Sequence, residues 1–308
     1  MIKNRNIAND AGIEVTKIIG SDIGEVRYVC KQGTNSHAML RSRVHPDMLY
    51  VCDGTADQVQ INEAIVASKG GTNSYIYVFP GAYSLTEPIT MRSRSSMHLL
   101  AANGKGFDTG APGAALLQQT GNYEVVIMEA YGELAGFQII NLDGYSAVTI
   151  AANIWRPQIH NNCFHMVAGS AINIIDATGT AAASYGSISH NRFATWVGGN
   201  LTSAINVGTG TGVDIIGNTI TQYNGTMDTG IAQAGAQCVV KDNTVSNCGG
   251  GGVVTVAVQL YAYSTAVGNR LSVDAGKALA GGTAANSFVD NMDGATGAGN
   301  GAASNLET

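Results

Sequence analysis

The chain has 308 residues and a formal net charge of −6, which is enough length for one large domain or two ordinary ones. Hydrophobic residues make up 45% of it and Pro is scarce, so a disordered chain and a collagen-like chain are both excluded. The five Cys residues are odd in number and form no Cys-x-x-Cys pair, which predicts neither a disulfide framework nor a zinc site.

Signals for membranes and secretion are also missing from the sequence. No apolar run reaches the roughly 18 residues that a membrane span requires. The first residues lack the apolar core of a signal peptide. We therefore expect a protein without a membrane span that is assembled in reducing cytoplasm.

The first 46 residues differ in charge from the rest of the chain. They hold seven basic and four acidic side chains, net +3, whereas the remaining nine basic and 18 acidic side chains give −9. This contrast predicts that residues 1–46 are a non-repeat arm that docks on a partner, with an ordinary solvated leader as the alternative. Docking would bury Ile13, Val15, Ile18 and Ile19. The arm is too weakly basic and too poor in aromatic residues to predict nucleic-acid binding.

A turn, one helix and a second turn are predicted after the arm. Asp53, Gly54 and Thr55 form the first turn, and Thr55 or Asp57 can cap the helix that follows. Phe79-Pro80-Gly81 then predicts a turn between two short strands. The predicted helix has one apolar face, formed by Val59, Ile61, Ala64 and Ile65.

Residues 155–293 repeat one short phrase: an apolar residue, two variable residues, an Asn, one variable residue and a second apolar residue. The Asn residues follow one another at steps of 29, 27, 25, 26 and 22 residues, by subtraction of their numbers. A period in this range predicts a solenoid in which each repeat forms one coil. The six Asn are Asn162, Asn191, Asn218, Asn243, Asn269 and Asn291.

The spacing within the phrase predicts where each coil bends. The two apolar positions are five residues apart, so on one flat strand they would point to opposite faces. Both are apolar in every copy except the last, where Asp293 replaces the second. We therefore expect a bend at or near the Asn, which tolerates the left-handed backbone region. Successive Asn amides would then stack about 4.8 Å apart as a ladder.

The order of these features resembles the pectate-lyase-like superfamily, which includes many phage tailspikes. The shared features are the Asp-Gly-Thr-x-Asp turn at 53–57, the helix, the Phe-Pro-Gly-x-Tyr turn at 79–83 and the Asn ladder. The resemblance implies an all-β, right-handed, single-stranded parallel β-helix over residues 47–293, capped at its N-terminal end by the helix. Residues 294–308 would be a Gly/Ala-rich tail. The resemblance is specific for fold and weak for function, because enzymes and inert virion proteins share this architecture.

Few residues have the pattern of a catalytic site. Glycoside hydrolysis needs two carboxylates about 5–9.5 Å apart, and the sequence has no Glu between Glu133 and Glu307. Neither a cofactor nor a metal site is predicted. The weak catalytic candidates are His160 and His190 from adjacent coils and Asp242 and Asp290 two coils apart, with solvated surface residues as the alternative. Sugar-stacking candidates, which could equally be core or subunit contacts, are Tyr185, Trp196, Tyr223, Tyr261 and Tyr263.

The resemblance implies a structural protein on the surface of a tailed-phage virion, either a capsid decoration or turret protein or a short tailspike. Residues 1–46 would dock on other virion proteins, and the β-helix would form a homotrimer that stabilises the particle or adheres to host surface glycans. The alternative is a polysaccharide-degrading depolymerase or lyase. Trp155-Arg156-Pro157 resembles part of a lyase motif, but the second Arg of that motif is missing.

Overall fold

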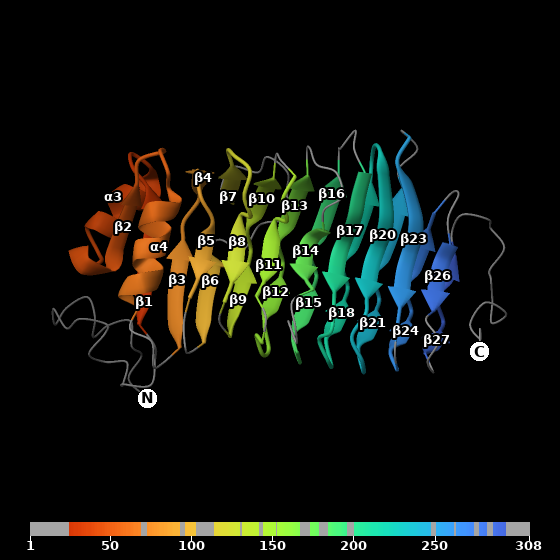
Figure 1. Ribbon diagram of the computed structural model, residues 1–308. Coiled ribbons are helices and arrows are strands. Elements are labelled where there is room, and N and C mark those ends of the chain that lie inside the picture. Colours follow the sequence, from red (N-terminus) through yellow and green to blue (C-terminus); the bar gives the residue numbers. More distant parts are fainter. Residues whose placement is uncertain are drawn as a thin grey trace, which may run out of the picture.

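The chain folds into an elongated parallel β-solenoid, shown by the computed structural model in Figure 1. Strands stack along one axis, and the helices lie at the N-terminal end. The prediction of an all-β parallel solenoid is confirmed, because every strand pair in the described residues is parallel and, from residue 74 onward, links successive coils. The structure describes residues 25–68, 73–92, 96–102, 114–129, 131–141, 144–151, 153–166, 173–178, 184–195, 200–247, 251–261, 263–273, 277–281 and 286–293.

Each coil contributes one strand to each of three sheets. The first sheet runs β2 (Leu49–Cys52), β1 (Val26–Lys31), β3 (Ser74–Val78), β6 (Met97–Ala101), β9 (Gly132–Ala135), β12 (Gln158–His160), β15 (Ser187–Ser189), β18 (Asp214–Ile216), β21 (Val239–Lys241), β24 (Thr265–Val267), β27 (Ser287–Val289). The second runs β4 (Gly81–Leu85), β7 (Ala115–Gln119), β10 (Gln138–Asn141), β13 (Cys163–Met166), β16 (Arg192–Thr195), β19 (Thr219–Gln222), β22 (Thr244–Asn247), β25 (Arg270–Ser272), β28 (Met292–Asp293). The third runs β5 (Ile89–Met91), β8 (Val126–Met128), β11 (Val148–Ile150), β14 (Asn173–Ala177), β17 (Asn200–Val207), β20 (Thr226–Gln233), β23 (Val253–Leu260), β26 (Lys277–Gly281).

The core is a stack of apolar side chains inside the coils. In the first sheet, Ile159, Ile188 and Ile215 occupy the first apolar position of the repeated phrase and are buried. In the second sheet, Phe164 and Phe193 occupy the second apolar position and stack with ring centroids 4.9 Å apart. Both positions therefore point inward, as expected from the spacing. Fully burying one such side chain stabilises the fold by about 1.5–3 kcal/mol, and successive coils repeat the gain.

The Asn ladder lies at the corner between the first and second sheets. The backbone N–H and the side-chain Nδ2 of Asn218 both donate to Asn243 Oδ1, at 2.9 and 3.0 Å. Asn218 Nδ2 also donates to the carbonyl oxygen of Ile188 at 2.8 Å. The same set of bonds recurs at every step from Asn162 to Asn291. Buried backbone groups at the corner are thus paired along the whole ladder.

The left-handed residue of this corner is the one before each ladder Asn. The bend lies near the Asn, as expected, but the Asn itself does not take the left-handed conformation. Its amide is needed for the buried hydrogen bonds, while the preceding side chain points outward. The left-handed positions before the six ladder Asn are Asn161, His190, Gly217, Asp242, Gly268 and Asp290, with φ between 51° and 64°.

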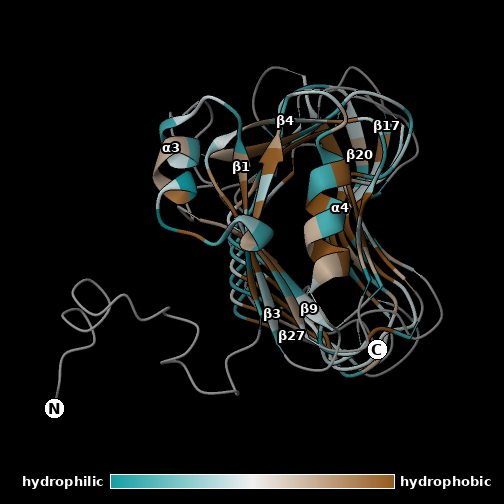
Figure 2. Ribbon diagram, turned by 90° about the vertical axis from the view of Figure 1, so that its left-hand side faces the viewer, coloured by the Kyte–Doolittle hydropathy of each residue, from teal (hydrophilic) through white to brown (hydrophobic). Residues whose placement is uncertain are grey.

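The helix α4 (Gln58–Ala67) lies across the N-terminal end of the solenoid, seen along its axis in Figure 2. Ile61, Ala64 and Ile65 are buried and the helix packs on β1, β2, β4 and β5. Val59, which was expected on this apolar face, is 43% exposed. Two shorter elements, α3 (Asn35–Arg41) and the 3-10 turn η1 (Pro46–Met48), lie between β1 and β2.

Asp57 ties three segments of this end together. Its buried carboxylate accepts hydrogen bonds from Lys31 Nζ at 2.5 Å and from the backbone N–H groups of Gly54 and Ser84, both at 2.8 Å. The turn itself lies where the sequence places it, and Asp53 accepts from the N–H of Thr55. Asp57 precedes α4 but its side chain makes no capping bond to the helix. The carboxylate stabilises tertiary contacts rather than the helix end.

The strand β1 belongs to the first sheet although it lies within residues 1–46. It pairs with β2 on one side and with β3 on the other, and Lys31 at its end pairs with Asp57. The boundary expected at residue 46 therefore falls inside the hydrogen-bonded part of the fold. The predicted docking residues and the predicted tail lie outside the described residues: Ile13, Val15, Ile18, Ile19 and residues 294–308.

Candidate functional site

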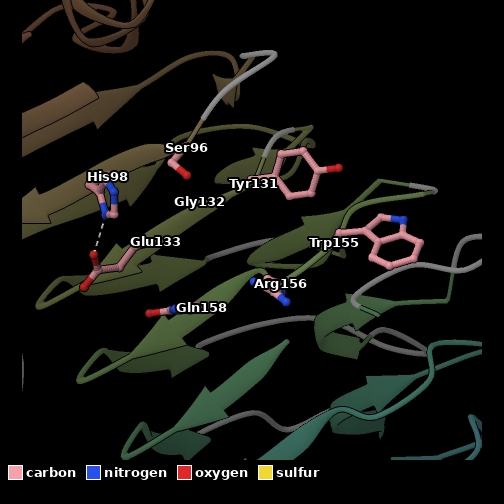
Figure 3. Close-up of a pocket in the computed structure, with 8 residues that line it drawn as sticks. All are labelled: Ser96, His98, Tyr131, Gly132, Glu133, Trp155, Arg156 and Gln158. Atoms are coloured by element: carbon pink, nitrogen blue, oxygen red, sulfur yellow. Dashed lines mark hydrogen bonds and ion pairs between the residues drawn. The ribbon is translucent and has the colours of Figure 1, made fainter. Parts of the chain in front are cut away.

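A cavity of about 420 Å³ opens on the outer face of the first sheet, where three successive coils enter β6, β9 and β12. Figure 3 shows the residues that line it from these coils. We call this cavity the corner pocket. It lies at the corner before the first-sheet strands, whereas the Asn ladder lies at the corner after them. Its lining residues are Ser96, His98, Tyr131, Gly132, Glu133, Trp155, Arg156 and Gln158.

Glu133 is bonded to two imidazole rings. The parallel register places it opposite His98 on one side and Gln158 on the other. Glu133 Oε2 lies 2.6 Å from His98 Nδ1, and Oε1 lies 2.6 Å from His160 Nε2. Each oxygen of the carboxylate therefore lies within hydrogen-bonding distance of one imidazole nitrogen.

The surrounding hydrogen bonds assign the protons of these rings. The side-chain amide of Asn161 donates to His160 Nδ1 at 2.9 Å, so His160 carries its proton on Nε2 and donates it to Glu133. His98 likewise donates from Nδ1, and its buried Nε2 has no partner among the described residues. Tyr75 stacks on the His98 ring with centroids 4.4 Å apart, which fixes the ring plane. The cluster is thus ordered on both sides of the carboxylate.

Aromatic rings stand at the rim of the pocket. Tyr131 and Trp155 are 45% and 49% exposed, although both are large apolar side chains. Trp155 packs against Tyr185 of the next coil, with ring centroids 5.5 Å apart. A ring that is both exposed and held by packing presents a flat apolar face with little entropy left to lose on binding.

The backbone under Arg156 is fixed in an unfavourable conformation. Arg156 has φ of 55°, and its N–H donates to the carbonyl oxygen of Ser184 at 2.8 Å. Trp155 forms a parallel bridge to Ser184 as well. The same conformation recurs in the next two coils at Tyr185 and Gly212, whose N–H groups also bond to the following coil, so it belongs to this turn of the solenoid. The neighbouring coil therefore holds the exposed Arg156 side chain at the pocket.

The structure brings together only part of the predicted site. His160 contacts Glu133, but His190, Asp242 and Asp290 occupy left-handed positions at the ladder corner and do not line the pocket. Asp242 lies 3.7 Å from Lys241. Of the predicted sugar-stacking residues, Tyr185 packs beside the pocket, and Trp196 lies outside the described residues. Tyr223, Tyr261 and Tyr263 belong to later coils.

Sequence reasoning missed His98, Glu133 and Tyr131. The available signal was an outward polar residue inside a strand, in Met97-His98-Leu99 and Gly132-Glu133-Leu134. Gly132 also permits close packing of the coils, because a Cβ there would lie 2.4 Å from the carbonyl oxygen of Met97. Neither signal distinguishes a binding site from an ordinary solvated strand without the pairing partners.

A Cys–His pair on the second sheet lacks the properties of a nucleophile. Cys163 Sγ lies 3.3 Å from His165 Nε2. Burial raises the pKa of Cys163 to about 11, and Arg192 opposes this only in part. Burial and Arg192 both lower the pKa of His165. The pair is therefore a neutral thiol beside a neutral imidazole at pH 7.

Two further features of the described residues bear on function. They contain no group of three or more His, Cys, Asp or Glu arranged to hold a metal ion. Among the same residues, no helix is long and apolar enough to cross a membrane.

Comparisons with known proteins found one structural likeness. No family model matches the chain, and no curated protein matches its sequence. The chain is similar to the structure of ORF18 of Geobacillus virus E2, with 13% identity and a TM-score of 0.39. The match covers 78% of this chain and 59% of that one, so the chain spans about three fifths of the length of the phage protein.

Proposed function

We propose that the protein is a structural component of a phage virion surface and that the corner pocket binds host surface glycans. The observation that carries the glycan site is the pairing of exposed rings with hydrogen-bonding groups in one cavity. Tyr131 and Trp155 offer apolar faces, and Arg156 and Gln158 offer N–H donors. Sugars are recognised by such a combination, because each ring has an apolar face and a rim of hydroxyl groups.

The pocket favours binding over hydrolysis. Of its lining residues, Glu133 alone carries a carboxylate, and both of its oxygens are bonded to imidazoles. Glycoside hydrolysis requires a second carboxylate about 5–9.5 Å away to act as acid, base or nucleophile. Degradation of the bound polysaccharide is thus the less supported alternative, and release of new reducing ends by the purified protein would establish it.

The virion location is proposed from the resemblance of the sequence and from the solenoid itself. A rigid stack with one continuous core presents its outer face without needing other domains, which suits a decoration protein or a short tailspike. The N-terminal arm, reduced to the residues before β1, would dock on the particle. Immunogold labelling of particles that carry this chain should place it on the capsid or on the tail.

The glycan site is tested with the full-length chain and a printed array of bacterial capsular polysaccharides and lipopolysaccharides. Trp155→Ala should weaken binding by at least about tenfold, because the stacking face is removed. Tyr263→Ala is the matched control, since Tyr263 is 65% exposed at the same corner of a distant coil. Equal loss in both variants, or binding that Trp155→Ala leaves unchanged, would place the glycan elsewhere.

A further inference from the structure

Arg156 is the uncompensated charge of the corner pocket. Among the eight lining residues, Glu133 supplies the carboxylate and Arg156 supplies the guanidinium. The Arg156 side chain is exposed and has no ion pair or side-chain hydrogen bond with the described residues. In Figure 3 it lies between Trp155 and Gln158, apart from the bond that joins His98 to Glu133. A guanidinium with five free N–H donors beside a cavity is suited to an anionic group.

The negative charge of the pocket, on Glu133, is hydrogen-bonded to two imidazoles of the protein. Glu133 accepts an N–H from His98 and another from His160, each at 2.6 Å. Each oxygen therefore already has one protein donor, and among the described residues Glu133 pairs with His98 and His160 and not with Arg156. The hydrogen bonds from the two imidazoles reduce the repulsion between this carboxylate and an anion at Arg156.

We propose that the corner pocket selects a saccharide unit that carries a negatively charged group, and that Arg156 binds this group. Carboxylate, sulfate and phosphate share the required chemistry, because each presents two oxygens to the planar guanidinium. Tyr131 or Trp155 would stack on the sugar ring that carries the charge. This inference rests on the glycan-binding function proposed above and adds the class of ligand.

The protein as a whole does not attract polyanions, which makes the test specific. The chain has a net charge of −6, so non-specific attraction to an acidic polymer is weak. Selective binding of such a polymer would have to come from a local group.

The test uses surface plasmon resonance with the full-length protein and matched polymers. Alginate is paired with carboxyl-reduced alginate, and dextran sulfate with dextran, while a poly(glycerol phosphate) teichoic acid supplies phosphate. We expect at least one acidic polymer to bind about 10- to 100-fold more tightly than a neutral one, as a charge-assisted bidentate bond predicts. Binding should fall with added salt, and the responding polymer identifies the charged group.

Substitutions distinguish selection of an acidic group by Arg156 from glycan binding in general. Arg156→Gln should remove the preference for the acidic polymer, and Arg156→Lys should retain part of it. Arg270→Gln, at another exposed arginine in β25, should change nothing. Equal binding of acidic and neutral polymers, or a preference that survives Arg156→Gln, overturns the inference and leaves the glycan site. Absence of binding to every polymer in this panel and to every glycan on the array overturns both.

Discussion

At the ladder corner, two adjacent residues have different roles: one faces solvent and bends the backbone, and the next points inward and bonds buried backbone groups. The left-handed position accepts Gly, Asn, His or Asp, and the next position holds an Asn in six successive coils, buried in the first five. The first residue makes the bend in the backbone and faces outward. The second replaces water as the partner of buried backbone groups.

Replacing Asn218 by Ala should lower the free energy of unfolding by about 1–3 kcal/mol, because Ile188 and Asn191 lose partners in a buried corner. Chemical denaturation measures the change. Asn224→Ala is the control, since Asn224 is exposed in a loop between β19 and β20. Equal midpoints for the two variants would show that the ladder contributes nothing.

His165 should make the fold sensitive to mild acid. Its pKa is lowered in the folded protein by burial and by Arg192, so the unfolded chain takes up a proton at higher pH than the folded one. The stability from the neutral ring is present above the ordinary pKa of about 6.5 and is lost as pH falls through the folded pKa. His165→Gln should reduce the loss of melting temperature between pH 7 and pH 5. An unchanged loss in the His165→Gln protein would contradict this expectation.

At the scale of elements, the N-terminal end depends on β1. This strand separates β2 from β3 in the first sheet, and Lys31 at its end pairs with the buried Asp57. Val29 and Cys30 within it are fully buried. Removing β1 would therefore expose apolar residues and leave a buried carboxylate without its cation.

Deletion of residues 1–24 should leave a soluble protein with an unchanged, cooperative melting transition, whereas deletion of residues 1–31 should not. The shorter deletion keeps β1 and its partners, and the longer one removes them. Circular dichroism melting compares the two. If the shorter form also fails to bind particles, the docking role belongs to residues 1–24. Wild-type occupancy of particles by that form would refute the docking proposal.

At the scale of the whole molecule, we propose a homotrimer, as expected from phage β-helix proteins. Light scattering after size exclusion should then give a mass of about three times the 31.7 kDa of one chain. A monomer at micromolar concentration would count against it. The Trp155→Ala protein should be sized in the same way. An unchanged mass would show that its weaker glycan binding does not come from loss of assembly.

The solenoid repeat and the position of the Asn ladder could be predicted from the sequence alone. Apolar positions five apart and Asn residues at steps of 22 to 29 are local signals, because every coil must bury its own inward side chains and pair its own bend. The ladder could therefore be placed residue by residue. The left-handed residue before each Asn could not, since Gly, Asn, His and Asp share no sequence pattern there.

Only the tertiary structure decided the corner pocket and the place of β1. His98, Glu133 and His160 are 35 and 27 residues apart in sequence and meet because parallel register aligns their coils. The coils of β6 and β9 precede the first ladder Asn, so no repeated phrase marks their register, and their outward residues cannot be matched from the sequence. Likewise, the sequence places Lys31 in a basic arm, whereas in the structure it forms an ion pair with the buried Asp57. Outside the ladder, contacts between coils are set by how the coils stack, and no local sequence pattern encodes that stacking.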